Sequence, residues 1–278
     1  MRYEMKIYIQ TDIEGIAGFC FFENHKSKDY ENIIHRQRMY KLFTAEVNAA
    51  VKAAFEAGAT EVYVNDSHSS GYNLIFEELD SRCKLIHGDN CSGPHWLPKL
   101  DSTFDAMILI GMHAMAGTKC AITPHSLWMV NDGEIKLSEG TMAAAIAGDF
   151  GVPAIMVSGD DKICAEFAEK IDGIEIAVVK EGLAPHQACT IMPAASCKLI
   201  AEKVKKAIFR LQNIKPFKIQ GPVKLALFDS ENHAPPYAQI GDSVIADNIN
   251  DAFLQYEKAM PWTHFDMEEP YGFVFPRG

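Results

Sequence analysis

No apolar stretch of the sequence is long enough to cross a lipid bilayer. A membrane-spanning helix needs about 20 consecutive, predominantly apolar residues, and no apolar stretch of this chain approaches that length. Residues 1–15 carry acidic side chains where a secretory signal peptide needs a continuous apolar core. We therefore expect a cytoplasmic protein that has no membrane partner.

Paired cysteines, basic clusters and a dinucleotide-binding loop are also missing. The seven cysteines are scattered, with no CxxC pair, so we expect neither a disulfide framework nor a thiolate zinc site. A formal charge of −11 without a cluster of basic residues argues against nucleic acid as a partner. No G-x-G-x-x-G motif follows the first expected strand, and the carboxylates found there would repel a pyrophosphate.

What the sequence does contain is an alternation of strand-length apolar runs with helical stretches. With 278 residues, of which 48% are hydrophobic, the chain suits a soluble α/β protein. Alternation of this kind predicts a largely parallel sheet flanked by helices. We expect strands over 5–12, 61–67, 83–88, 105–114, 153–161 and 174–181, and helices over 38–58, 138–151, 161–171 and 194–213.

Two interruptions of the alternation suggest further structure. Residues 127–137 read as a hairpin, because the Asn-Asp-Gly sequence at 131–133 favours positive φ. A stretch rich in Pro and Gly near 213–222 suggests a boundary. We expect an α/β catalytic domain with the metal site over 1–213, and a smaller α+β part over 214–278 that contributes to oligomer contacts or to the substrate pocket.

Asp12 and Glu14 stand two residues apart at the end of the first apolar run. Side chains alternate along a strand, so these two carboxylates leave the backbone on the same face. Like charges this close repel each other unless a cation lies between them or water reaches them. The pair therefore indicates either a metal site or a solvated strand end.

Further imidazole and carboxylate groups follow the other strands. His68, His113, His125 and Glu139 come at or shortly after the ends of later elements, and the carboxyl ends of parallel strands meet at one edge of a sheet. Each residue has a simpler explanation: a histidine hydrogen-bonded near the surface, or an acid at a helix start. Asp66 more readily caps the turn that follows it.

The simpler explanations do not account for the gathering of these groups at one sheet edge. Mixed histidine and carboxylate ligands without thiolate suit zinc, manganese or cobalt. Even five of these groups exceed the needs of one tetrahedral zinc that also binds water. With one bridging carboxylate they suit two ions roughly 3.5 Å apart, as in hydrolytic two-metal sites.

Six stretches, in their order and spacing, resemble the D-aminopeptidases of the DppA type, the M55 peptidase family. The resemblance covers about the first 180 residues well and the remainder loosely. The stretches are TDIEGIAG (11–18), VNDSHSSGYNL (64–74), GMHAMAGT (111–118), PHS (124–126), SEGTMAAAIAG (138–148) and VPAIMVSGDD (152–161).

The resemblance implies a di-zinc aminopeptidase that removes N-terminal D-amino acids from short peptides and assembles as a ring-shaped homodecamer. It implies that Asp12 bridges both ions and that Glu14 and His68 complete the ligands of one ion. His113 and Glu139 would complete those of the other. His125 would be the catalytic histidine and not a ligand, and its exact role stays open.

The sequence departs from the family in places. Where relatives commonly carry an arginine after the strand that ends at Lys180, this chain has Pro185 and His186. His233 is a candidate by composition only, and a structural role is the better interpretation. Competing functions are another binuclear metallohydrolase on the same scaffold, an amidase or a phosphoesterase, and a metal-binding oligomer without turnover.

Overall fold

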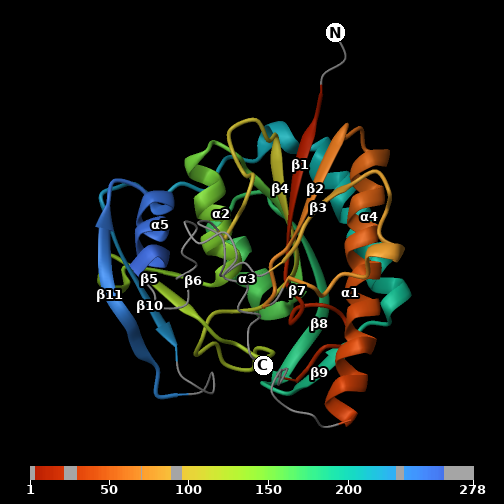
Figure 1. Ribbon diagram of the computed structural model, residues 1–278, viewed down its shortest axis with the longest axis horizontal. Coiled ribbons are helices and arrows are strands. Elements are labelled where there is room, and N and C mark those ends of the chain that lie inside the picture. Colours follow the sequence, from red (N-terminus) through yellow and green to blue (C-terminus); the bar gives the residue numbers. More distant parts are fainter. Residues whose placement is uncertain (1–3, 22–29, 70, 89–95, 230–234, 260–278) are drawn as a thin grey trace, which may run out of the picture.

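Figure 1 shows the computed structural model of the chain, which describes residues 4–21, 30–69, 71–88, 96–229 and 235–259. A seven-stranded sheet forms its centre, in the order β3-β2-β1-β4-β7-β8-β9. Neighbouring strands are parallel except for β8 and β9, which form an antiparallel pair. The strands are β1 Lys6–Thr11, β2 Glu61–Asp66, β3 Lys84–Ile86, β4 Ala106–Met112, β7 Ala154–Asp160, β8 Glu175–Ala184 and β9 Gln187–Thr190.

Helices cover both faces of this sheet, which confirms the predicted α/β class. Helices α1 (Tyr30–Glu56) and α4 (Pro193–Phe209) pack together on one face, while α2 (Glu139–Asp149) and α3 (Asp161–Lys170) lie on the other (Figure 1). The central strands β1, β4 and β7 are buried along almost their whole length. Burial on both faces explains why these strands read as continuous apolar runs.

Helix α1 begins eight residues earlier than its apolar period predicts. Phe43, Val47 and Val51 are fully buried, as expected for the face that packs on the sheet. Ile33 and Ile34 in the first turns are exposed, so the pattern that identified the rest of the helix is absent there.

The described residues contain no helix that meets the length and hydrophobicity of a membrane span.

A second, antiparallel sheet lies beside the first in the order β11-β10-β5-β6. Its β5–β6 hairpin confirms the predicted turn, because residues 131–133 all have positive φ. The sheet takes strands from both sides of residue 213, and the domain boundary there stays a prediction. The elements are β5 Leu127–Val130, β6 Ile135–Leu137, β10 Val223–Asp229 and β11 Ala238–Ala246, with helix α5 (Ile249–Ala259) packed against β10 and β11.

Two glycines bring the segment after β1 onto the end of β4. Gly15 donates a backbone hydrogen bond to the Gly111 carbonyl oxygen at 2.7 Å. A Cβ atom at Gly15 would lie 2.0 Å from the carbonyl oxygen of Met112, and one at Gly111, where φ is +75°, would lie 2.0 Å from that of Asp12. Only residues without a side chain allow this approach, so the two strand ends share one narrow edge.

Candidate functional site

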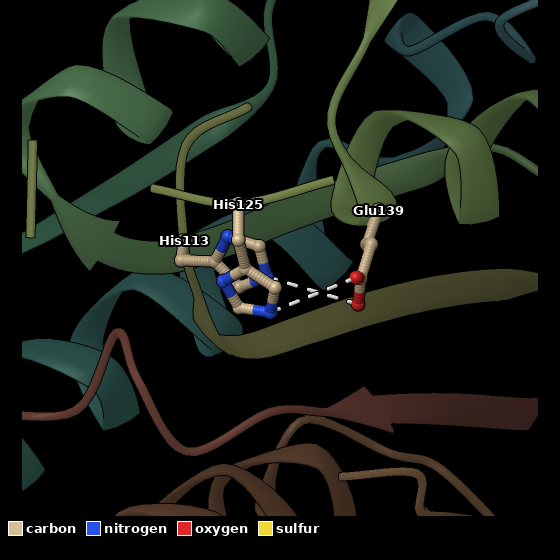
Figure 2. A group of neighbouring side chains, drawn as sticks. All are labelled: His113, His125 and Glu139. Atoms are coloured by element: carbon tan, nitrogen blue, oxygen red, sulfur yellow. Dashed lines mark ion pairs between the residues drawn. The ribbon is translucent and has the colours of Figure 1, made fainter. Parts of the chain in front are cut away.

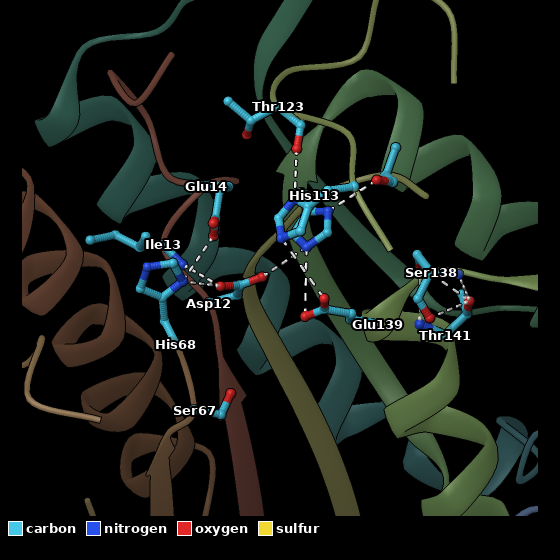
Figure 3. Close-up of polar contacts among 12 residues, drawn as sticks. Asp12, Ile13, Glu14, Ser67, His68, His113, Thr123, Ser138, Glu139 and Thr141 are labelled. Carbon is cyan, nitrogen blue, oxygen red and sulfur yellow. Dashed lines mark hydrogen bonds and ion pairs between the residues drawn. The ribbon is translucent and has the colours of Figure 1, made fainter. Parts of the chain in front are cut away.

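All six predicted site residues lie at the carboxyl-terminal edge of the main sheet, in two groups of three (Figures 2 and 3). We call Asp12, Glu14 and His68 cluster A, and His113, His125 and Glu139 cluster B. Within each group, one potential ligand atom from every residue lies within 4.8 Å of the others. Both groups have the atoms and the spacing needed to hold a metal ion.

Cluster A is built from the segments that follow β1 and β2. His68 Nδ1 lies 3.0 Å from Asp12 Oδ1 and 3.2 Å from Glu14 Oε2. Both carboxylates are almost fully buried, with exposed fractions of 6% and 5%. The backbone N–H of Ile13 donates to Asp12 Oδ1 at 2.9 Å, which fixes the orientation of that carboxylate. The predicted convergence of Asp12 and Glu14 is therefore present.

Cluster B combines two histidines that follow β4 with the first residue of α2. The rings of His113 and His125 stack with centroids 3.9 Å apart and an interplanar angle of 12°. Their Nε2 atoms lie 3.7 Å and 3.8 Å from the two carboxylate oxygens of Glu139 (Figure 2). Both rings thus present the same nitrogen to the same carboxylate.

Backbone carbonyls orient both rings of cluster B. His113 Nδ1 faces the carbonyl oxygen of Ala114 at 3.0 Å, and His125 Nδ1 faces that of Thr123 at 2.9 Å. A carbonyl oxygen only accepts hydrogen bonds, so Nδ1 is the protonated nitrogen in each ring. This tautomer leaves the Nε2 lone pair of the neutral imidazole available to a metal ion or a proton.

Asp12 connects the two clusters. Its Oδ1 contacts His68, while its Oδ2 lies 3.4 Å from His113 Nε2. One buried carboxylate therefore faces a histidine of each cluster with a different oxygen. Asp12 is therefore the candidate for a carboxylate shared by both clusters.

Concentrating these groups in a buried space perturbs their protonation. Burial and the neighbouring Glu14 raise the pKa of Asp12 to about 8. Burial would lower the pKa of His113, but Glu139 and Asp12 raise it to about 10. Burial alone would raise the pKa of Glu139, and His113 instead brings it down to about 2. Perturbations of this size within one group of neighbouring side chains are typical of functional sites.

A family model described as D-aminopeptidase, Peptidase M55, matches residues 5–257. The chain belongs to the M55 peptidase family. A D-aminopeptidase of Bacillus subtilis (strain 168) is 34% identical to this M55 peptidase over 224 residues, which are 76% of this chain and 77% of the relative. The family and the predicted reaction class are confirmed: the protein is a metallo-aminopeptidase, a hydrolase that acts on peptide bonds.

A solved structure resembles the M55 peptidase over nearly its whole length. It is the Zn-dependent D-aminopeptidase DppA from Bacillus subtilis, titled a self-compartmentalizing protease. The two structures align with a TM-score of 0.78 and 29% sequence identity, over 92% of this chain and 97% of that chain. The shared fold includes the mainly parallel sheet on which both clusters lie.

The turn that carries His68 in the M55 peptidase is held by Asp66. Its carboxylate accepts hydrogen bonds from the backbone N–H groups of Asn73 and Leu74, at 2.7 Å and 2.9 Å, and from the Asn73 side chain. The prediction that Asp66 caps this turn is therefore confirmed. Asp66 stabilises the turn that carries His68 and is not itself a member of cluster A.

The loop that carries His125 is held by Asp160 and by the β8–β9 turn. Asp160 Oδ1 caps helix α3, while its Oδ2 accepts a hydrogen bond from the backbone N–H of Ile122 at 2.8 Å. The carbonyl oxygen of Pro185 accepts from the Thr123 N–H at 3.0 Å. The turn where the sequence departs from its relatives thus contacts the His125 loop. His233 lies outside the described residues.

Sequence reasoning missed Glu166, which supports Glu139 from helix α3. Ser138 is the N-cap of the helix that Glu139 begins, and Thr141 completes the capping box. Glu166 Oε1 accepts from the Ser138 N–H at 3.0 Å, the Ser138 hydroxyl at 2.9 Å and the Thr141 hydroxyl at 2.6 Å. No sequence signal identifies Glu166, because it lies more than twenty residues away and only the packing of α3 on α2 brings it there.

Lys180 is a second supporting residue whose contacts the sequence did not reveal. Its side chain is buried, and its Nζ donates to the carbonyl oxygens of Glu14, Ile16 and Phe19. Burial lowers the pKa of Lys180 to about 8. In the sequence this lysine marks only the end of a strand, and nothing near it indicates contacts with residues more than 160 positions earlier.

Proposed function

We propose that this M55 peptidase is a di-zinc aminopeptidase that removes an N-terminal D-amino acid from short peptides. The observation that carries the proposal is the arrangement of clusters A and B around the shared carboxylate of Asp12. Five predicted ligands from segments far apart in the chain converge there, and the reaction class is that of the family.

The residues of both clusters fit a divalent cation. Among the described residues, His113 Nε2 and Glu14 Oε2 are buried and make ion-pair contacts but no hydrogen bond. Buried polar atoms without hydrogen bonds are costly, and coordination of a cation would satisfy both. Imidazole and carboxylate ligands without thiolate suit zinc, the metal on which the DppA neighbour is described as dependent.

We assign Asp12 as the bridging ligand, Glu14 and His68 to one ion, and His113 and Glu139 to the other. When bound, such ions act as Lewis acids toward the scissile carbonyl and lower the pKa of a coordinated water. The carboxylates of Asp12, Glu14 and Glu139 would compensate part of the positive charge, and the neutral imidazoles would donate lone pairs to the ions. The same ligands would hold the ions close to His125.

His125 is proposed as the catalytic residue that moves the proton. Burial and the neighbouring His113 lower its pKa, so the imidazole is neutral at pH 7 with its proton on Nδ1, facing the Thr123 carbonyl. Its Nε2 accepts a proton as water attacks and delivers that proton to the leaving amine. Stabilisation of the oxyanion and direct attack by the imidazole are the alternative roles.

The proposals on substrate chirality and on assembly are based on the relatives. The curated relative is named a D-aminopeptidase, and the DppA neighbour is titled a self-compartmentalizing protease. We propose the same preference for D residues here, and a ring-shaped homodecamer with an internal chamber, located in the cytoplasm. Peptides short enough to enter such a chamber would be the substrates.

Hydrolysis of paired chromogenic substrates tests the function. Purified chain, stripped with chelator and reloaded with zinc, should cleave D-Ala p-nitroanilide faster than L-Ala p-nitroanilide and should leave a panel of phosphate esters intact. Preference for the L substrate would contradict the chirality, and ester hydrolysis without amide cleavage would favour a phosphoesterase. Inactivity on every D- and L-peptide tried would favour a metal-binding oligomer.

Anomalous diffraction at the zinc and manganese edges tests the metal directly. Crystals grown without added metal should show two zinc peaks, one beside each cluster. A single peak would contradict the two-ion part of the proposal, and a signal at the manganese edge alone would contradict the choice of zinc.

A further inference from the structure

The loop that follows β1, residues 14–19, has no regular secondary structure, yet distant elements hold its polar backbone groups. The N–H of Gly15 donates to Gly111, that of Ala17 donates to Glu46 Oε1 at 3.0 Å, and that of Gly18 donates to Thr190 Oγ1 at 3.1 Å. We call residues 14–19 the β1 loop. Its conformation is therefore determined by contacts with β4, α1 and β9.

The carbonyl groups of the β1 loop converge on one ammonium group. Lys180 Nζ donates to the carbonyl oxygen of Glu14 in a short hydrogen bond, to that of Ile16 at 2.9 Å and to that of Phe19 at 2.7 Å. An ammonium group has three donors, and the three carbonyls use all of them. The exposed fraction of Lys180 is 2%, so the loop replaces water around its charge.

A buried lysine normally pairs with a carboxylate, since burying an isolated charge is costly. No carboxylate of the described residues lies within ion-pair distance of Lys180 Nζ. The buried carboxylates of Asp160, Glu46 and Glu14 stabilise its charge from a longer distance, and the three loop carbonyls make the direct contacts. Such an arrangement constrains the loop more than the lysine, because all three carbonyls must point at one atom.

Glu14 is the member of cluster A that this arrangement constrains most directly. Its own carbonyl oxygen is bound by Lys180, and the N–H of the same peptide unit, that of Gly15, is bound by the Gly111 carbonyl. Both sides of the peptide plane after Glu14 are therefore fixed. A rigid plane at this position sets the direction in which the Glu14 side chain leaves the backbone toward His68.

We propose that Lys180 is a positioning residue for Glu14: it holds the β1 loop so that the Glu14 carboxylate faces His68 and Asp12 in cluster A. This inference rests on the proposed function, in which Glu14 is a metal ligand. Partners that orient metal ligands typically contribute 10- to 100-fold to metal affinity. Lys180 would contribute in this way to one ion and not to the other.

Zinc titration of metal-free chain, in competition with a chromophoric chelator, tests the proposal. Lys180→Met keeps most of the side-chain volume but removes all three donors. We expect it to weaken binding of one ion about 10- to 100-fold and to leave the other near wild type. Thr190→Val is the matched control, because it removes a hydrogen bond to the same loop at Gly18 and leaves the Glu14 peptide plane intact. It should change neither affinity.

Glu14→Gln identifies the ion that belongs to cluster A. The proposal is supported if Lys180→Met and Glu14→Gln weaken the same ion. It is overturned if Lys180→Met leaves both affinities unchanged, weakens both equally, or weakens the ion that Glu139→Gln removes. If Lys180→Met does not fold by circular dichroism, Lys180→Gln, which keeps two donors, should fold and weaken the same ion by a smaller factor; unchanged affinity there would also overturn the proposal.

The same titration separates this inference from the proposed function. If the wild-type chain binds a single zinc, the two-ion assignment fails. The role of Lys180 is then tested on the affinity for that ion alone. If Lys180→Met and Glu14→Gln both weaken zinc binding, the positioning role is supported. A loss in Glu14→Gln without a loss in Lys180→Met contradicts it.

Discussion

Clusters A and B present similar ligand atoms on different supports. In cluster A, Asp12 and Glu14 come from one irregular segment after β1, and their backbone is held by contacts from several distant elements. In cluster B, Glu139 is the first residue of a regular helix with a complete capping box. The carboxylates of cluster A are almost fully buried, whereas the Glu139 side chain retains an exposed fraction of 28%.

The difference shows how a ligand can be fixed with or without regular structure. A helix start fixes its first residues through its own hydrogen bonds, so a cap and one supporting acid, Glu166, suffice in cluster B. An irregular loop has no such internal framework, and cluster A depends on the glycine contact and on Lys180. We therefore expect cluster A to lose its geometry when a single distant side chain is removed, and cluster B to be more tolerant.

Loss of the shared carboxylate should have the largest effect. Asp12→Asn removes the carboxylate that faces both clusters. We expect at least one ion to be lost and activity to fall about 10⁴-fold, because bound metal supplies several kcal/mol and about 1.4 kcal/mol corresponds to tenfold. Elemental analysis and kcat/KM measure the two effects. Glu14→Gln and Glu139→Gln serve as controls that should each affect one ion. Full metal occupancy in Asp12→Asn would contradict the bridging role.

Removal of His125 should separate catalysis from metal binding within cluster B. His125→Ala should lower kcat about 10³-fold, within the range of roughly 10²–10⁴ for a general acid or base, and should leave bound metal near wild type. Its stacking partner provides the comparison, since His113→Ala should lose metal as well as activity. Metal loss in His125→Ala would instead identify His125 as a third ligand of cluster B.

Removal of Glu166 tests how far cluster B depends on support from outside its helix. Glu166→Ala takes away the acceptor for Ser138 and Thr141, and we expect roughly 10-fold weaker zinc binding at the Glu139 ion. Glu166→Gln keeps one acceptor oxygen and should bind zinc nearly as wild type. A loss in Glu166→Ala larger than that in Lys180→Met would reverse the expected order of tolerance between the clusters.

The smallest effect is expected far from both clusters, at the amino-terminal end of β8. There Glu175 contacts Lys203, Lys206 and Arg210 at 3.3, 2.9 and 2.6 Å. Because these cations are partly exposed, we expect Glu175→Gln to lower the free energy of unfolding at pH 7 by only about 1 kcal/mol. Zinc stoichiometry and kcat should not change.

The pH dependence of the unfolding free energy of Glu175→Gln tests whether charge causes the stabilisation. Burial would raise the pKa of Glu175, but the three cations hold it below the ordinary value of 4.5. The stabilisation is therefore fully present above about pH 4.5 and is lost as pH falls through the lower pKa of the folded state. Denaturant unfolding between pH 3 and 7 should show the difference from wild type shrinking on acidification. A constant difference would point to packing instead of charge.

Much of the fold followed from local sequence patterns. Strands β1, β4 and β7 were readable as apolar runs, and the β5–β6 hairpin was readable because its turn sequence favours positive φ. The start of α1 was not readable, since Ile33 and Ile34 do not face the core. Membership of β5 in the second sheet was not readable either, because its partner β10 lies about 100 residues away along the chain.

The sequence by itself determined which residues could ligate metal and that parallel strands would bring them to one edge, because side-chain alternation and strand direction are local properties. Only the tertiary structure decided that Asp12 faces both clusters, and that Lys180 and Glu166 support them. Those contacts join residues that are distant in the chain, and their distances depend on how glycines, loops and helices pack. No local pattern encodes that packing.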